Sequence, residues 1–117
     1  MQLQLYGKKI WVYRKIVDFR SSIDGLVSLV TRDIKIPARD GIFLFFNRGK
    51  DKVKCLSWHK NGFVLLYKRL ESGYFQMKFH EDSGVMEINT DELSWLLAGL
   101  EWQKMRDWKE LNYSKFS

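Results

Sequence analysis

Cations and aromatic rings are concentrated in residues 48–69, at a spacing that could bind a polyanion. This stretch holds seven cations and one acid, so its net charge of +6 equals that of the whole chain. The cations are Arg48, Lys50, Lys52, Lys54, Lys60, Lys68 and Arg69. Trp58, Phe63 and Tyr67 lie among them. Cations neutralise phosphates and rings stack on unpaired bases, each base contributing about 1–3 kcal/mol, so the pattern is typical of a nucleic-acid surface.

The same pattern has a purely structural interpretation. The aromatic rings could pack beneath a helix, while the cations form a solvated rim with their aliphatic stems lying on the apolar surface. A rim of this kind could still touch phosphate. The sequence leaves both interpretations open.

The elements that would position these residues are short strands separated by glycine-containing turns. The β-favouring runs are 42–47, 52–60, 63–71, 74–79 and 85–88. An N-terminal strand pair at 2–6 and 10–15 is also compatible with the pattern. Short strands at this spacing predict an antiparallel β-meander of about five to six strands.

Asn61-Gly62 predicts a two-residue hairpin turn, because a type I′ turn needs positive φ at both central positions. This turn would pair Lys60 with Phe63 and Trp58 with Leu65. One hairpin face then carries three cations and all three rings. Its members are Lys54, Lys60, Arg69, Trp58, Phe63 and Tyr67. The other face is mainly apolar, holds Lys68 and Cys55, and would supply core.

Two amphipathic helices are expected to pack against this sheet. The first spans 22–32, with Ser21 as its N-cap and Asp24 three residues later. The second begins at Asn89 or Thr90 and carries acids in its first turn. We therefore predict an α+β fold with a single domain over 1–102, followed by a tail or short helix over 103–117.

Several functional classes find no support in the sequence. Apolar runs are too short to cross a membrane, and the single cysteine suits a reducing cytoplasm, so we expect a cytoplasmic protein. No phosphate-binding loop and no zinc-ligand spacing occur, so neither a cofactor nor a metal is expected. Five acids could in principle serve a metal-dependent nuclease, but they form no recognisable motif. They are Asp18, Asp24, Asp40, Asp51 and Glu71.

Three blocks of sequence resemble a known family. They are VDFRSSIDGLVSLV (17–30), IFLFFNRGKDKVKCLSWHKNGFVLLYKRLESGYF (42–75) and ELSWLLAGLEW (92–102). Together they are similar to the small protein encoded by the second open reading frame of IS-66-type bacterial insertion sequences, often called TnpB. The chain departs from that family at His59, where an acidic residue is more usual. The resemblance implies a helper for transposition that acts beside a separate transposase.

Our leading hypothesis is a non-enzymatic accessory protein that contacts insertion-sequence DNA through the 48–69 hairpin. The expected DNA-binding residues are Arg48, Lys50, Lys52, Lys54, Trp58, Lys60, Phe63, Tyr67 and Arg69. The alternative is an interaction module that docks on the transposase through Trp108, Tyr113 and Phe116. Arg20 is a further residue that could bind phosphate, although we favour an ion pair of Arg20 with Asp18 or Asp24. The oligomeric state is left open.

Overall fold

The computed structural model describes residues 7–76 and 84–99. Within these ranges the chain forms five strands and two α-helices, which confirms the α+β class. In chain order they are β1 (Lys9–Ile16), α1 (Ile23–Leu29), β2 (Gly41–Phe46), β3 (Lys52–His59), β4 (Gly62–Arg69), β5 (Val85–Ile88) and α2 (Thr90–Leu97). A π-helical segment, η1 (Val30–Ile34), continues directly from α1.

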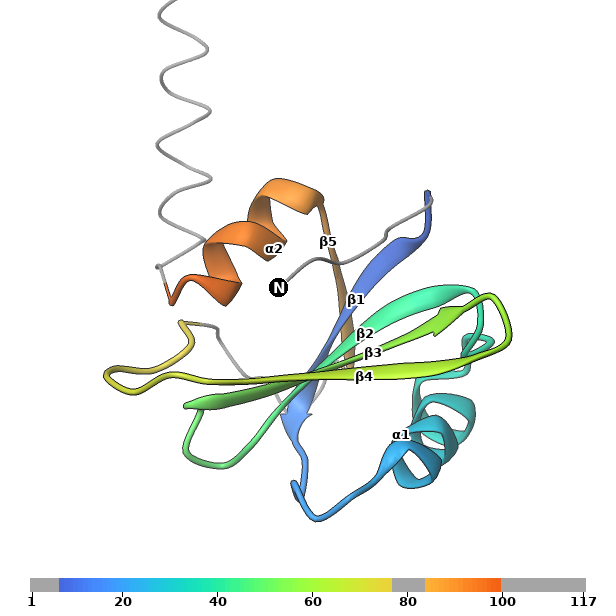
Figure 1. Cartoon of the computed structure of the whole chain (residues 1–117), viewed down its shortest axis with the longest axis horizontal. Helices are drawn as coiled ribbons and strands as arrows, with labels where there is room; N and C mark the ends of the chain where they lie inside the picture. Colours follow the sequence, from blue (N-terminus) through green and yellow to red (C-terminus); the bar gives the residue numbers. More distant parts are fainter. Residues whose placement is uncertain (1–6, 77–83, 100–117) are drawn as a thin grey trace, which may run out of the picture.

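The strands form one mixed sheet in the order β4-β3-β2-β1-β5 (Figure 1). Strands β1 and β2 run parallel, whereas every other neighbouring pair in the sheet is antiparallel. The prediction of a purely antiparallel meander is therefore wrong. Its error lies in the β1–β2 connection, which contains α1 and η1 and so forms the helical crossover that a parallel pair requires.

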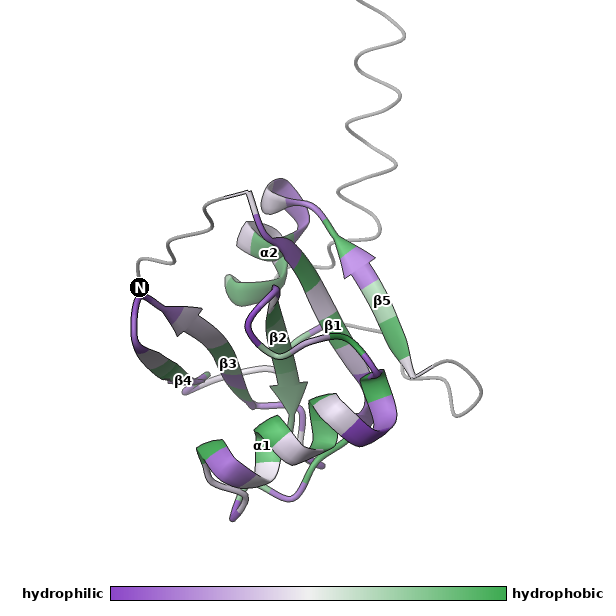
Figure 2. Cartoon of the chain, turned by 90° about the vertical axis from the view of Figure 1, so that its right-hand side faces the viewer, coloured by the Kyte–Doolittle hydropathy of each residue, from purple (hydrophilic) through white to green (hydrophobic). Residues whose placement is uncertain are grey.

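Strand β2 is the centre of the molecule and is buried on both faces. All of Gly41–Phe46 is buried, and Figure 2 shows this strand as hydrophobic along its length. Phe45 packs in one core with Leu26 of α1, whereas Leu44 packs in the other core with Leu96 of α2. The two helices thus cover opposite faces of the sheet (Figure 1).

Helix α1 begins one residue later than predicted. Its N-cap is Ser22, which makes no side-chain capping hydrogen bond. The backbone carbonyl of Ser21 instead accepts a hydrogen bond from a lysine of β3, so this segment is fixed to the sheet rather than to the helix end. The helical path ends at Lys35, which has the left-handed φ of 62°.

Helix α2 begins as predicted and has a complete capping box. The Asn89 side chain accepts a hydrogen bond from the Glu92 backbone N–H at 2.8 Å, and the Glu92 carboxylate accepts one from the Asn89 N–H at 3.1 Å. Two of the donors at the start of the helix are thereby satisfied.

Other predictions are corrected or remain untested. Residues 74–76 are not in a strand, so the run at 74–79 is wrong over that part, and 77–79 lie outside the described residues. The proposed strand at 2–6 and the tail over 103–117 also lie outside them. The single-domain assignment stays a prediction.

Candidate nucleic-acid interface

Strands β3 and β4 form the expected basic hairpin, but the turn lies one residue earlier than predicted. His59 pairs with Gly62, so Lys60 and Asn61 make the turn. Lys60 adopts a φ of 54°, and the Asn61 N–H donates to the His59 carbonyl at 2.6 Å. The predicted pairing of Lys60 with Phe63 is wrong, and the register is shifted by two residues. A shift of two leaves every side chain on its predicted face.

A pair of aromatic rings accounts for this register. Trp58 now lies opposite Phe63, and the two rings meet edge to face with centroids 4.9 Å apart. Such a pair contributes about 0.5–1.5 kcal/mol beyond its buried area, which a lysine opposite Phe63 would not supply. The Arg39 guanidinium lies 4.0 Å from the centroid of the Trp58 ring. These contacts favour the structural interpretation for both rings.

Lys54 is also engaged within the fold. Its side chain is only 9% exposed. The ammonium donates to the carbonyls of Phe19 and Ser21, each at 2.8 Å, and lies 4.8 Å from the centroid of the Phe19 ring. Lys54 therefore ties β3 to the segment between β1 and α1, and phosphate would have to displace two hydrogen bonds to reach it.

Lys68 points to the opposite face of the sheet, as predicted. Its ammonium donates to the carbonyl of Leu97 at 2.6 Å. That carbonyl closes the C-terminal end of α2, where the helix dipole favours a positive charge. Two of the seven hairpin cations therefore serve the fold.

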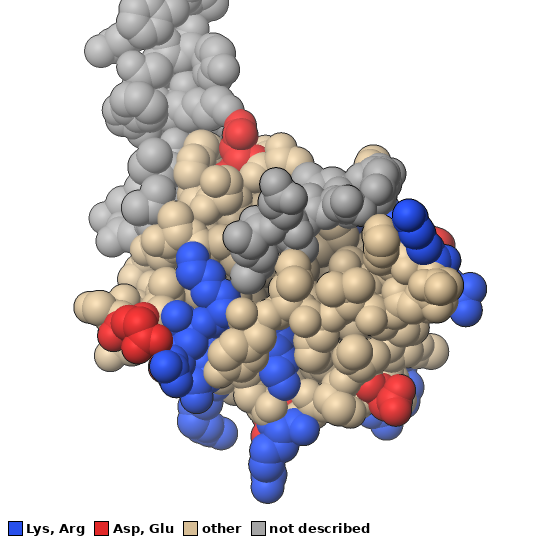
Figure 3. Space-filling model, viewed as in Figure 1, with Lys and Arg blue, Asp and Glu red and all other residues tan. Residues whose placement is uncertain are grey.

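The other five hairpin cations are the ones that a polyanion could contact. They are Arg48, Lys50, Lys52, Lys60 and Arg69. Arg48, Lys60 and Arg69 are exposed, while Lys52 is partly buried and pairs with Arg69 across the strands. Arg69 also forms a 2.9 Å ion pair with Glu71, which is itself exposed. Figure 3 shows lysines and arginines gathered over the side of the molecule where β3 begins and β4 ends.

Tyr67 is the most exposed of the three predicted rings, at 50%. Its ring leans on Phe19, with the two centroids 6.1 Å apart and the planes inclined by 59°. Tyr67 and Arg69 are two residues apart on β4, so their side chains lie on the same face of the sheet as neighbours. Phe19 thus contacts both Tyr67 and the buried Lys54.

Arg20 is paired with Asp18, as we favoured from the sequence. The Arg20 Nη2 donates to the Asp18 carboxylate at 2.6 Å, and the Arg20 backbone N–H donates to it at 2.9 Å. Hydrogen bonding from the Arg20 side chain is the main cause that lowers the pKa of Asp18 to about 2. Both side chains are exposed, so solvent screens this pair and it contributes little to stability.

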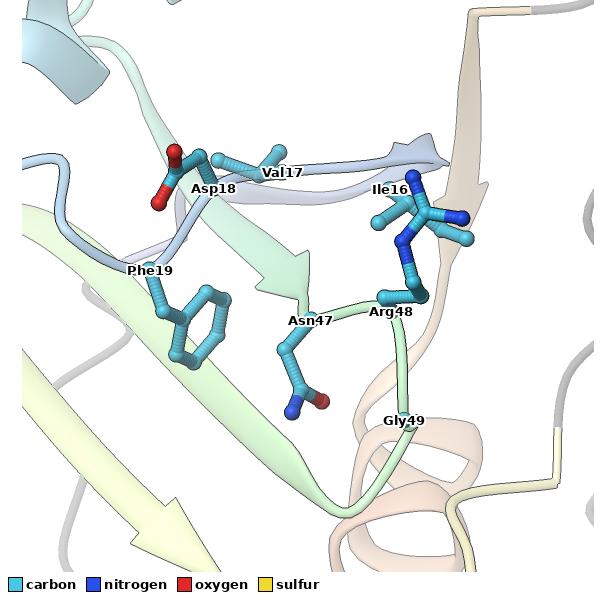
Figure 4. A pocket seen from close by; sticks show the side chains of 7 residues that line it. All are labelled: Ile16, Val17, Asp18, Phe19, Asn47, Arg48 and Gly49. Atoms are coloured by element: carbon cyan, nitrogen blue, oxygen red, sulfur yellow. The ribbon is translucent and has the colours of Figure 1, made fainter.

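A pocket of about 400 Å³ opens beside Phe19, at the carboxyl ends of the parallel strands β1 and β2 (Figure 4). Ligand sites in α/β sheets often lie at such strand ends. The pocket is lined by Ile16, Val17, Asp18, Phe19, Asn47, Arg48 and Gly49. The Asn47 side chain is held in place at the pocket wall by two hydrogen bonds. Its amide nitrogen donates to the Asp51 carboxylate at 2.7 Å, and its side-chain oxygen accepts from the Lys52 backbone N–H at 3.0 Å.

Sequence reasoning missed the roles of Phe19, Arg39 and Asn47. A signal for Phe19 was present, because the DFRSS run follows a β-favouring segment and precedes a helix. A residue at that junction lies at the end of a strand and close to the sheet edge. No comparable local signal marked Arg39, whose contact with Trp58 spans distant parts of the chain.

Asp51, one of the acids considered for a nuclease, has a structural partner, and Cys55 is buried. Burial raises the pKa of the Cys55 thiol to about 12, which keeps it protonated. Asp51 accepts a hydrogen bond from the Asn47 amide, which lowers its pKa. In residues 7–76 and 84–99, no three His, Cys, Asp or Glu side chains come together as a metal site would require. Nor is any helix of these ranges long and apolar enough to cross a membrane.

The transposase-docking prediction falls on residues that the structure does not describe. Trp108, Tyr113 and Phe116 all lie beyond residue 99. Their role stays a prediction.

Comparisons with known proteins match most of the chain. The family model described as IS66 Orf2-like protein matches residues 8–107. Uncharacterized protein y4jC of Sinorhizobium fredii (strain NBRC 101917 / NGR234) is 36% identical over 101 residues, covering 86% of this chain and 86% of the relative. Uncharacterized protein y4hO of the same strain is 29% identical over 96 residues, covering 81% and 83%. No solved structure matches the chain.

Proposed function

The chain belongs to the IS66 Orf2-like family of insertion-sequence proteins, and we propose that it assists transposition by binding DNA without catalysing strand chemistry. The family implies a role accessory to transposition. A separate transposase of the same element would then carry out the strand chemistry, and that transposase is a proposed partner.

The observation that carries this proposal is the location of the net charge. The entire +6 lies within 48–69. The hairpin presents Arg48, Lys52 and Arg69 at or near the surface at the end where β3 begins and β4 ends, and Lys60 at the turn at the other end. Clustered cations raise the local concentration of a polyanion and neutralise its phosphates on contact.

A binding role also agrees with the local use of the described acids. Asp18 is paired with Arg20, Glu71 with Arg69, and Asp51 with the Asn47 amide. Each of these three acids is therefore engaged by a neighbouring side chain, which suits a binding surface better than a nuclease site.

The salt dependence of DNA binding tests the proposal. If about four phosphates are neutralised, log K against log[salt] should have a slope of roughly −3 to −4 on DNA. Fluorescence anisotropy of the full chain on labelled element-end DNA and on random DNA, between about 50 and 200 mM salt, measures this slope. An absence of binding at the lowest salt, or a slope near zero, would contradict the proposal.

Docking on the transposase without DNA contact is the second candidate. The exposed apolar side chains of Val64 in β4 and Tyr74 after it favour it, because they leave apolar surface on and next to the hairpin. Co-purification with the transposase that survives nuclease treatment, together with a failed anisotropy experiment, would favour this function over the first.

A further inference from the structure

The Tyr67–Phe19 ring pair lies near Lys52 and Arg69 and beside the pocket that Phe19 lines. Tyr67 is 50% exposed, whereas Trp58 is only partly exposed and lies beneath the Arg39 guanidinium. Of the three rings in the hairpin, Tyr67 therefore has the most surface available for stacking. Phe19 supports it from below at a centroid distance of 6.1 Å.

Two cations lie on the same face of the sheet as Tyr67, at positions fixed by the strand register. Lys52 and Arg69 pair across β3 and β4, two residues beyond the Lys54–Tyr67 pair. The same strand alternation therefore places Lys52 and Arg69 on the Tyr67 side of the sheet. Arg48 also lines the pocket, from the loop that follows β2 (Figure 4).

The pocket itself is better suited to an uncharged group than to a phosphate. Asp18 contributes to its lining and is held ionised by Arg20, with a pKa of about 2. A phosphate placed there would face a like charge. The remaining walls include the Phe19 ring and Val17, which offer apolar contacts to a flat heterocycle, and Asn47, whose amide is held by Asp51 and Lys52.

We propose that this end of the sheet binds unpaired DNA. One base stacks on Tyr67, a neighbouring base enters the pocket beside Phe19, and Lys52, Arg69 and Arg48 contact the phosphates between them. Bases in a duplex are stacked on one another, so their faces are not available to a protein ring without unpairing. This inference rests on the proposed function and adds the strand state of the DNA.

Anisotropy with matched oligonucleotides tests the inference. The full chain is titrated against a fluorescein-labelled single strand and against the duplex of the same sequence, at one salt concentration. We expect the single strand to bind about 10-fold more tightly than the duplex. Tyr67→Ala should weaken binding to the single strand by about 10-fold, as loss of one stacked base does, and should change binding to the duplex by less than about twofold.

One further variant controls for general effects, and a second tests the pocket. Tyr74→Ala removes a tyrosine that is 62% exposed but follows the end of β4, and it should change neither affinity. Ile16→Trp adds bulk at a pocket-lining site that is 44% exposed, and it should weaken binding to the single strand only. Thermal melting establishes that each variant is folded.

The outcomes separate this inference from the proposed function. Duplex binding that equals or exceeds single-strand binding overturns the inference and leaves the proposed function standing. A Tyr67→Ala variant that binds the single strand as tightly as the unmodified chain also overturns it. Failure to bind either DNA overturns both.

Discussion

Reversing the charge of Arg48, Lys52 and Arg69 to glutamate is expected to weaken DNA binding by about 100-fold or more. These cations remain at or near the surface after Lys54 and Lys68 are committed to backbone carbonyls. Each charge-assisted phosphate contact contributes on the order of 1 kcal/mol or more, so three lost contacts multiply to roughly this factor. Arg48 and Arg69 are exposed, Lys52 is partly buried, and the ion pair of Arg69 with Glu71 is screened by solvent, so the fold should persist, as circular dichroism and thermal melting can establish.

A matched variant separates the position of charge from its amount. Lys9, Lys15 and Arg32 are also exposed, and their reversal to glutamate changes the net charge by the same amount at other sites. We expect this control to weaken binding several-fold less than the hairpin variant. Equal losses in the two variants would mean that DNA responds to net charge alone, and an unchanged affinity in the hairpin variant would exclude the hairpin as the contact.

Lys54→Ala is expected to lower the free energy of unfolding by about 2–4 kcal/mol, because it leaves two acceptors without their charged donor. The ammonium that it removes donates to the carbonyls of Phe19 and Ser21 in a site where the lysine is 9% exposed. The segment between β1 and α1 would lose its hydrogen bonds to β3. Urea unfolding followed by tryptophan fluorescence measures the change.

Two further variants show whether the hydrogen bonds carry this effect. Lys60→Ala removes an exposed lysine from the hairpin turn and should change stability by less than about 0.5 kcal/mol. Lys54→Met keeps the aliphatic stem while removing the ammonium, and it should recover only the packing part of the loss. A Lys54→Ala variant as stable as Lys60→Ala would show that the buried ammonium contributes nothing.

Local signals in the sequence predicted several elements well. The Asn89–Glu92 spacing predicted the start of α2, because a capping box involves only neighbouring residues. The period-two alternation predicted the two faces of the hairpin, even though the turn was misplaced. An error of two residues in register does not exchange faces, which is why Tyr67 and Arg69 were assigned to the correct side.

Features that depend on distant contacts were not predicted. The parallel pairing of β1 with β2 requires knowing that α1 crosses between them, although a helix between two β-favouring runs was a signal for it. The burial of Lys54 depends on carbonyls in a segment more than thirty residues away along the chain. A lysine in a basic run gives no local sign that its ammonium is committed to the fold.

The proposed binding surface is consequently smaller than the charge pattern suggested. Lys54 and Lys68 contribute to the +6 but serve the structure. Trp58 and Phe63 contribute aromatic rings that pack against each other. What remains is the end of the sheet where Tyr67, Lys52 and Arg69 lie beside the pocket formed by the segments after β1 and β2.

The most direct test is to map the residues that touch DNA. The full chain is irradiated with DNA that contains bromodeoxyuridine, and the cross-linked peptides are identified by mass spectrometry. We predict that the cross-links fall within 48–52 and 67–69 and at Phe19, at the end of the sheet where β3 begins and β4 ends. Cross-links confined to α2, or to the segment beyond Trp102, would contradict the claim that this chain binds DNA through its basic hairpin.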